Sequence, residues 1–450
     1  MPRKQIHLAA FLPGTGNPTV WSDPRAGSQI GFDTFTHAAR TAERGKFDFL
    51  FLSEGLRLRE HKGELYELDV AGRPEALTVL SALAAVTSRL GLAANISSIF
   101  NEPYEVARRL AALDHLSEGR AAWNVVTGWD DSTGENFRRG DYLPESERYA
   151  RAAEFLHTAR ELWDSWAEDD LPADPAGGEF VRAGAGAFTH QGTHFDISGR
   201  FNTPRSPQGH PVIIQAGESP QARAFAAADA DVIFSRHNRL AEARGFYRDI
   251  KGRLPGHGRS PDDLRILSSV SYVLGDTTEE AHERAAEIRR VQTSPQTAIA
   301  HLEAIWGRDL SDHDPDGPLP DFDPDPGDVL LKGHARFRVD RIDTARQWRR
   351  LAGERGLSIR ELVTEVTGQQ TFVGTPREVA DAMDAFVQTG GSDGFVVTPH
   401  VTPGGLDELV DRVVPLLQEK GVYRTEYTGT TLRDHLGLTD ARRPSRETAV

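Results

Sequence analysis

Short β-rich runs and longer amphipathic segments alternate along most of the chain. The β-rich runs lie at 6–12, 47–53, 90–98, 121–126, 211–216, 231–235, 265–274 and 394–399. The run at 121–126, AAWNVV, is short and mostly apolar, which is typical of a strand buried on both faces. Together these runs predict eight strands of a parallel sheet.

Between the strands, apolar residues recur at helical spacing. The segments with this periodicity are 32–45, 76–89, 103–117, 146–166, 220–229, 240–252, 278–291, 376–389 and 406–420. Eight strands with intervening helices favour a closed (β/α)8 TIM barrel over an open doubly wound sheet, which usually has fewer strands. We therefore predict an α/β fold of the TIM-barrel class.

The stretch at 101–128 illustrates one helix–strand unit of this repeat. Asn101 is predicted to cap the helix, and Pro103 lies in the first turn, where a missing N–H costs nothing. Gly119 ends the helix, and the strand that follows leads into the polar sequence TGWDDSTGEN. Loops at the carboxyl ends of barrel strands carry the chemistry in this fold, so this loop is a candidate part of an active site.

Two long stretches interrupt the repeat, at about 167–210 and about 292–375. The second contains an acidic, Pro-rich run and a further helical pattern around 341–366. Loops of this length are usually functional covers or linkers. We predict one TIM-barrel domain over 1–424 with these two insertions, followed by a polar C-terminal tail, 425–450, that wraps the surface or a partner subunit.

Composition narrows the possible partners. The formal net charge of −15 argues against nucleic acid or an anionic membrane surface as a partner. The chain has no cysteine, which excludes disulfides, thiolate metal sites and a cysteine nucleophile. His190 and His194 form only a weak metal pair because the sequence around them is not helical. The first residues indicate a strand rather than a signal peptide, and we expect a soluble, cytoplasmic protein without a bound metal.

Several long motifs occur in order along nearly the whole chain. They are the stretch at 101–128, FDFLFLSEG at 47–55, ERYARAAEFLHTARELWDSW at 147–166, FNTPRSPQGHPVIIQAGESPQAR at 201–223, and VGTPREVADAMDAFVQTGGSDGFVV at 373–397. Together they resemble the flavin-dependent two-component monooxygenases of the bacterial luciferase superfamily, in the branch of the nitrilotriacetate, EDTA and dibenzothiophene-sulfone monooxygenases. The resemblance implies a TIM barrel that uses dioxygen and reduced FMN, which a separate NAD(P)H-dependent flavin reductase supplies.

The sequence QAGESPQAR contains a candidate phosphate site. Gly217 follows a strand and permits a tight turn, and Ser219 begins a helix whose free N–H groups favour an anion. The alternative is an ordinary helix cap. By resemblance, Ser219 and Tyr149 contact the FMN phosphate, although a tyrosine at helical spacing is also typical of the core. Arg148 adds charge to this site or pairs with a glutamate of its own helix.

Small polar residues after the third strand can approach the flat flavin ring or bond to the backbone. They are Asn95, Ser97 and Ser98. Asn124 in the fourth strand points toward the flavin's polar edge or into a buried network. Two positions of the family's flavin site differ here, because relatives commonly carry an aspartate where this chain has Ser53 and a histidine where it has Glu145.

The remaining candidates lie at strand ends, on the expected active-site face. We predict catalytic roles for Asn124, Thr127, His237 and Glu54, and substrate contacts for Phe11, Arg57, Trp129 and His400. The aromatic residues expected near the mouth indicate an aromatic or heterocyclic substrate. They are Phe11, Trp21, Phe100 and Trp129. The absence of GxSxG, HExxH and P-loop motifs agrees with chemistry that a cofactor performs.

Three other functions compete with a monooxygenase. One is deazaflavin-dependent hydride transfer without oxygen, and another is a non-catalytic flavin-binding protein, which the substitutions at Ser53 and Glu145 would favour. A metal-dependent barrel hydrolase is disfavoured, because few histidine and carboxylate pairs occur at strand ends. We also expect a homo-oligomer, either a dimer or a tetramer, that acts on a small molecule.

Overall fold

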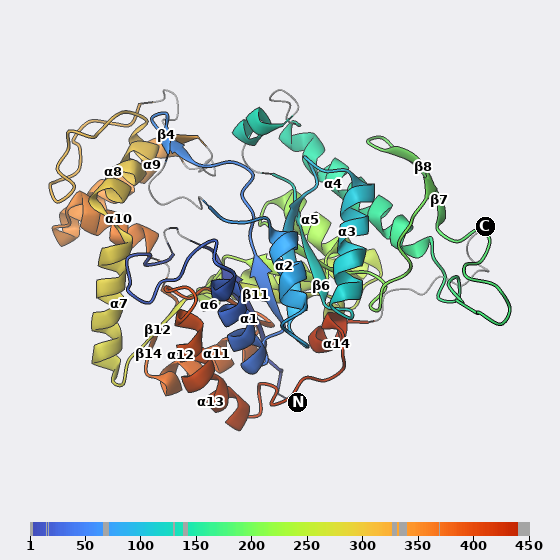
Figure 1. Cartoon of the computed structure of the whole chain (residues 1–450). Coiled ribbons are helices and arrows are strands. Elements are labelled where there is room, and N and C mark those ends of the chain that lie inside the picture. Colours follow the sequence, from blue (N-terminus) through green and yellow to red (C-terminus); the bar gives the residue numbers. More distant parts are fainter. Residues whose placement is uncertain are drawn as a thin grey trace.

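Eight parallel strands close a barrel at the centre of the molecule (Figure 1). The computed structural model describes residues 3–14, 16, 18–65, 72–128, 131–137, 143–325, 331–332, 340–368 and 370–439. The barrel strands are β1 (His7–Leu12), β2 (Phe49–Leu52), β5 (Gly91–Ser97), β6 (Ala121–Val126), β9 (Val212–Ala216), β10 (Val232–Ser235), β11 (Arg265–Val270) and β15 (Gly394–Val397). Each lies within a predicted β-rich run, so the TIM barrel is confirmed.

Helices surround the barrel at nearly all the positions that the apolar periodicity predicted. They are α1 (Phe32–Arg44), α2 (Ala76–Ala84), α3 (Pro103–Leu116), α4 (Glu145–Asp164), α5 (Pro220–Asp229), α6 (Leu240–Arg253), α7 (Thr278–Gln292), α11 (Pro376–Gln388), α12 (Gly405–Arg412) and α13 (Val414–Glu419). The segment predicted as one helix at 406–420 is two, because Pro415 lacks the N–H that a continuous helix needs.

The predicted cap of α3 is wrong. Glu102, not Asn101, precedes the first turn, and no side chain caps it. The Asn101 amide instead donates to the Ser97 carbonyl, 2.8 Å away, and so holds the end of β5 against the start of α3.

The last third of the chain departs from the simple repeat. The run at 265–274 divides after β11, and β12 (Tyr272–Leu274) leaves the barrel to pair in parallel with β14 (Phe372–Gly374). Strand β12 precedes α7 and the second insertion, and β14 lies at the carboxyl end of that insertion, so their pairing brings together the two parts of the chain that flank this region.

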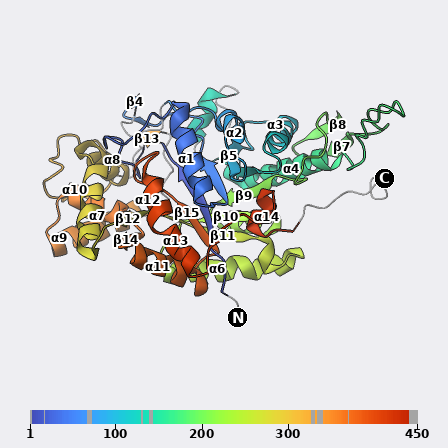
Figure 2. The ribbon, with the colours of Figure 1, turned by 60° about the horizontal axis from the view of Figure 1, so that its bottom comes forward.

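The second insertion is a small helical subdomain with a core of its own. It contains α8 (Pro295–Trp306), α9 (Arg341–Arg355) and α10 (Ile359–Thr367), which lie side by side in Figures 1 and 2. Buried Trp306 is part of its core. The helical pattern at 341–366 predicted α9 and α10, whereas α8 was not predicted.

Two hairpins and a short strand extend from the barrel. The first insertion carries β7 (Ala187–Gln191) and β8 (Asp196–Arg200), which project from the right-hand side in Figure 2. A second hairpin follows β2 and consists of β3 (Glu60–His61) and β4 (Glu64–Leu65), with β13 (Leu331–Lys332) paired to β3.

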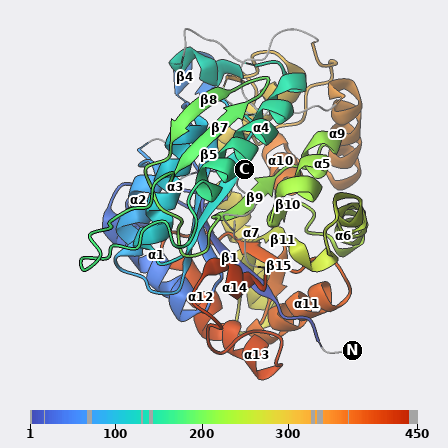
Figure 3. The same cartoon turned by 90° about the vertical axis from the view of Figure 1, so that its right-hand side faces the viewer.

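The amino-terminal end of the barrel is closed by residues from the segment predicted as a polar tail. Helix α14 (Leu432–Leu436) lies at this end (Figure 3), and Leu432 and Leu436 are fully buried in the cluster that fills the barrel. These leucines are part of the core because their side chains complete the apolar interior. No helix in the described part of the chain is long and apolar enough to cross a membrane.

Candidate functional site

The register of the strands determines which side chains face the open, carboxyl-terminal end of the barrel. Ala93 of β5 and Ala122 of β6 belong to the interior cluster. Side chains alternate along a strand, so Asn95 and Asn124, two residues further on, also face the interior. The same alternation places Ser97 inside.

Two asparagines on adjacent strands form a short polar chain. The Asn124 amide donates to Asn95 Oδ1 over 2.6 Å, and the Asn95 amide donates to the backbone oxygen of Glu54 over 3.1 Å. Asn124 is only 4% exposed, and its Oδ1 has no hydrogen-bond partner among the described residues. A buried acceptor without a partner is costly, so this atom fits a donor on a bound molecule.

A cavity of about 60 Å³ brings four of the predicted residues together. Glu54, Arg57, Asn95 and Ser97 all line it. Arg57 pairs with Glu60 over 2.8 Å and with Glu135 over 2.6 Å, so its charge is balanced by carboxylates of this chain.

Glu54 is the carboxyl group at this end of the barrel best suited to exchange a proton near neutral pH. Burial, together with the negative charge of Glu75, raises its pKa to about 7. A carboxyl group with such a pKa can act as a general acid or base at physiological pH.

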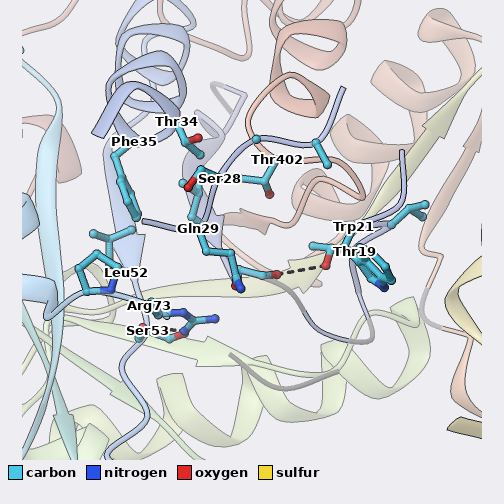
Figure 4. A pocket seen from close by; sticks show the side chains of 16 residues that line it. Thr19, Trp21, Ser28, Gln29, Thr34, Phe35, Leu52, Ser53, Arg73 and Thr402 are labelled. Atoms are coloured by element: carbon cyan, nitrogen blue, oxygen red, sulfur yellow. Dashed lines mark hydrogen bonds between the residues drawn. The ribbon is translucent and has the colours of Figure 1, made fainter. Parts of the chain in front are cut away.

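Ser53 is held by an arginine that sequence reasoning missed. Arg73 Nη1 donates to the Ser53 hydroxyl over 2.5 Å and to the Ser53 carbonyl over 2.7 Å. Both residues line an adjacent, mainly apolar cavity of about 180 Å³, where Figure 4 shows them on the same side as Leu52. The sequence around Arg73 contains no recognisable motif, so no sequence signal connected this residue to Ser53.

Tyr149, Gly217 and Ser219 come together at the start of α5. A Cβ on Gly217 would lie 3.6 Å from the Tyr149 hydroxyl and only 2.8 Å from the Ala222 Cβ, so the turn is tightly packed. The Ser219 hydroxyl accepts from the Ala222 N–H over 3.1 Å as the helix cap. The observed cap and the predicted anion site therefore share one helix end, and the positive end of the helix dipole lies beside the Tyr149 hydroxyl.

Helix α4 carries the other two residues predicted near the phosphate. Arg148 Nη1 donates to the Gly128 carbonyl over 2.8 Å and so fastens α4 to the loop after β6. Glu145 is the first residue of α4, but its side chain lies outside the described part of the structure. Trp129 also lies outside the described residues.

Three predicted residues line neither the cavity of about 60 Å³ nor that of about 180 Å³. The Ser98 hydroxyl donates to the Val126 carbonyl over 3.1 Å. Thr127 and His237 lie just beyond the ends of β6 and β10, and the His237 ring packs on Phe246 of α6 with ring centroids 5.2 Å apart.

Phe11 and His400 line a third and larger cavity of about 450 Å³. Burial and the nearby Arg284 lower the pKa of His400 to about 4, so its imidazole is neutral at pH 7. Helices α7, α8 and α10 also line this cavity, with residues that include Arg289 and His301. Sequence reasoning missed those two because the apolar pattern does not say where an insertion packs.

No metal site accompanies these cavities within the described ranges. None of the described residues forms a group of three or more histidine and carboxylate side chains that could hold an ion. His190, half of the weak pair noted in the sequence, bonds instead to Glu161 over 2.7 Å.

Comparisons with known proteins agree on one family. A family model described as luciferase-like monooxygenase matches residues 17–393. The chain is 40% identical over 444 residues to N-acetyl-S-(2-succino)cysteine monooxygenase of Bacillus subtilis (strain 168), with 97% of each chain covered. It is 36% identical over 451 residues to nitrilotriacetate monooxygenase component A of Aminobacter aminovorans, again with 97% of each covered. The solved structure of a riboflavin lyase with modified FMN and riboflavin matches with a TM-score of 0.80 and 29% identity, over 97% of each chain.

Proposed function

Because the chain belongs to the luciferase-like monooxygenase family, we propose that it is a monooxygenase that uses reduced FMN and dioxygen to oxidise a small organic molecule. One structural observation carries the proposal. The Asn124–Asn95–Glu54 chain and the cluster of Tyr149, Gly217 and Ser219 occupy the carboxyl ends of adjacent strands. The flavin ring of one FMN molecule would lie against the first group of residues, and its phosphate against the second.

The start of α5 would hold the FMN phosphate. Its first N–H groups carry the positive end of the helix dipole, and the Tyr149 hydroxyl lies beside the turn at Gly217. Arg148 contributes by keeping α4, and with it Tyr149, fixed against the loop after β6.

The inward-facing residues of β5 and β6 would contact the ring. Asn124 Oδ1 is available to accept from a ring N–H, while Asn95 orients the Asn124 amide. Ser53 brings no charge where relatives commonly have an aspartate, but Arg73 places a guanidinium at that position. We infer that Arg73 favours the negative charge of a reduced ring, and that Glu54 holds or releases a proton beside it.

When bound, reduced FMN supplies the electrons that activate dioxygen. The protein excludes water and positions the substrate, which requires no nucleophilic triad. Catalytic roles for Thr127 and His237 remain predictions from the sequence, as do a cytoplasmic location and a dimer or tetramer. A separate NAD(P)H-dependent flavin reductase is the proposed partner, and the designation of one relative as a component A supports a system of several proteins.

The sequence favoured an aromatic or heterocyclic substrate, but the residues behind that prediction do not share a cavity. Phe11 lines the cavity of about 450 Å³, Trp21 the one of about 180 Å³, and Phe100 the one of about 60 Å³. Two relatives are named for N-acetyl-S-(2-succino)cysteine and nitrilotriacetate, which both carry several carboxylates. A carboxylate-bearing substrate is therefore the stronger alternative.

The function is tested with the purified protein, FMN and an NAD(P)H-dependent flavin reductase. We expect FMN to bind and oxygen to be consumed with conversion of a substrate from a panel of carboxylates, sulfones and heterocycles. Tight FMN binding without oxygenation of any substrate would favour a storage protein. A preference for a deazaflavin over FMN would replace the proposal with hydride transfer.

A further inference from the structure

The open end of the barrel has two halves with different chemistry. Strands β9, β6, β5 and β2 are consecutive in the barrel and carry the residues proposed to hold the cofactor. The other four strands, β10, β11, β15 and β1, are also consecutive, and the cavity of about 450 Å³ lies over their carboxyl ends. The helical subdomain covers this second half, because α7, α8 and α10 complete the lining.

The lining of this cavity combines apolar side chains with basic, hydroxyl and amide groups, and none of its described residues is negatively charged. Among the described residues that line it there is no aspartate or glutamate, in a chain with 67 acidic residues and a formal net charge of −15. Its basic and imidazole members are Arg236, Arg289, His301 and His400, and the other polar members are hydroxyl and amide side chains.

Two arginines approach the cavity from opposite elements. Arg289 comes from the last turn of α7 and makes no ion pair with any described residue. Arg236 comes from the end of β10, where its guanidinium lies 3.3 Å from Glu218. No carboxylate of a described residue compensates the positive charge of Arg289, whereas Glu218 partly compensates that of Arg236. The cavity is partly shielded from water, which strengthens the attraction of Arg289 for an anion.

The neutral side chains suit the same ligand. A carboxylate only accepts hydrogen bonds, and the hydroxyl groups of Ser269 and Thr398, which line the cavity, can donate them. His400 is 6% exposed, and its Nδ1 has no partner among the described residues, so it too is available to a ligand.

We propose that this cavity binds a small substrate with at least two carboxylates, and that Arg289 is the main determinant of that specificity. The inference rests on the proposed function, since it places the substrate beside a cofactor held by the neighbouring half of the barrel. A guanidinium group can bind a carboxylate with two parallel hydrogen bonds. One carboxylate of the substrate would therefore bind Arg289, and the other would lie near Arg236.

The test uses the FMN-loaded protein, titrated calorimetrically in metal-free buffer with nitrilotriacetate, succinate and dimethyl succinate. The variants are Arg289→Gln and Arg289→Lys, with Arg290→Gln as the matched control. Arg290 is the next residue of α7 but is exposed and pairs with Glu287. We expect Arg289→Gln to weaken binding of the best dicarboxylate or tricarboxylate by about 10-fold or more, Arg289→Lys to restore part of it, and Arg290→Gln to change it little.

The affinity for FMN, measured separately, should be the same in all four proteins. The inference is overturned if none of the carboxylates binds, if dimethyl succinate binds as well as succinate, or if Arg289→Gln has no larger effect than Arg290→Gln. In those cases FMN binding and oxygenation of a neutral substrate would still uphold the proposed function. If the wild-type protein did not bind FMN, the proposed function would be contradicted. The affinities for the carboxylates would then still test whether the cavity binds them through Arg289.

Discussion

The buried carboxyl group of Glu54 lowers the stability of the folded protein at neutral pH, and a proton-transfer role is proposed for the same group. Its carboxyl group is largely buried near Glu75, and both effects oppose ionisation, which raises the pKa to about 7. The folded protein therefore holds this proton over a pH range in which the unfolded chain has already lost it. Such a cost is commonly retained where a proton is needed for chemistry.

This cost predicts a pH-dependent effect of Glu54→Gln on stability. The folded-state pKa of about 7 is above the ordinary value of 4.5, so wild-type stability falls as pH rises through this window and the penalty is complete above pH 7. The variant should be more stable than wild type at pH 8, by up to about 3 kcal/mol, with little difference at pH 4.5. Urea unfolding at both values measures this, with the exposed Glu64→Gln as control. An equal effect at both pH values would contradict it.

Tyr149→Phe is expected to weaken FMN binding without destabilising the fold. The variant keeps the ring that packs near Phe225 and removes only the hydroxyl beside Gly217. A lost hydrogen bond to a charged group costs about 1.5 to 3 kcal/mol, which corresponds to about a 10-fold or larger rise in Kd. Fluorescence titration with FMN gives the Kd, and Tyr104→Phe on α3 is the matched control. An unchanged Kd would remove Tyr149 from the phosphate site.

At the scale of elements, the same arrangement of a buried aspartate occurs three times at the amino-terminal end of the barrel. Asp48, Asp231 and Asp393 each precede a strand and accept a backbone N–H from the neighbouring strand, over 2.8 to 2.9 Å. Each is buried and pairs with a cation, Arg424, Arg433 or Lys251 respectively. Two of these cations precede or belong to α14, which explains why a polar C-terminal segment lies against the barrel.

Asp48→Asn tests how much this buried aspartate and its ion pair contribute to stability. The pKa of Asp48 is lowered to about 2, with Arg424 and His7 as the charges that overcome burial. The substitution leaves Arg424 without its carboxylate and should lower the free energy of unfolding by about 3 to 5 kcal/mol at pH 7. The contribution is present above the ordinary carboxyl pKa and declines as pH falls toward 2, so the difference from wild type should shrink below pH 4. Chemical denaturation measures both effects, and Asp411→Asn, exposed on α12, should cost little.

On the scale of the whole molecule, one buried carboxylate links the helical subdomain to the hairpin beside the half of the barrel that is proposed to hold the cofactor. Glu303 of α8 is fully buried and contacts His61 and Lys62 of the hairpin after β2, with Lys62 Nζ at 2.7 Å. The same hairpin contains Glu60, which pairs with Arg57 at the cavity of about 60 Å³. These contacts connect residues more than 240 positions apart in the chain.

Glu303→Gln should loosen this connection. The amide keeps the shape but loses the charge that Lys62 faces, so we expect faster amide hydrogen exchange in 60–65 and a loss of about 1 to 3 kcal/mol in stability. Exchange measured by mass spectrometry reports the hairpin directly. Glu365→Gln, which breaks the half-exposed pair with Arg355, should leave 60–65 unchanged. If 60–65 exchanged at the wild-type rate, the hairpin would be held by other contacts.

The sequence alone predicted the alternation of strands and helices, because the spacing of apolar residues reflects local backbone geometry. The motifs likewise predict that Asn124, Tyr149 and Ser219 belong to a flavin site. Which side chains converge depends on contacts between distant segments, and periodicity carries no information about those. The pairing of Arg73 with Ser53, the placement of Arg289 over the barrel mouth and the burial of Leu436 arise only when loops, insertion and tail pack together, since burial and electrostatics depend on neighbours in space.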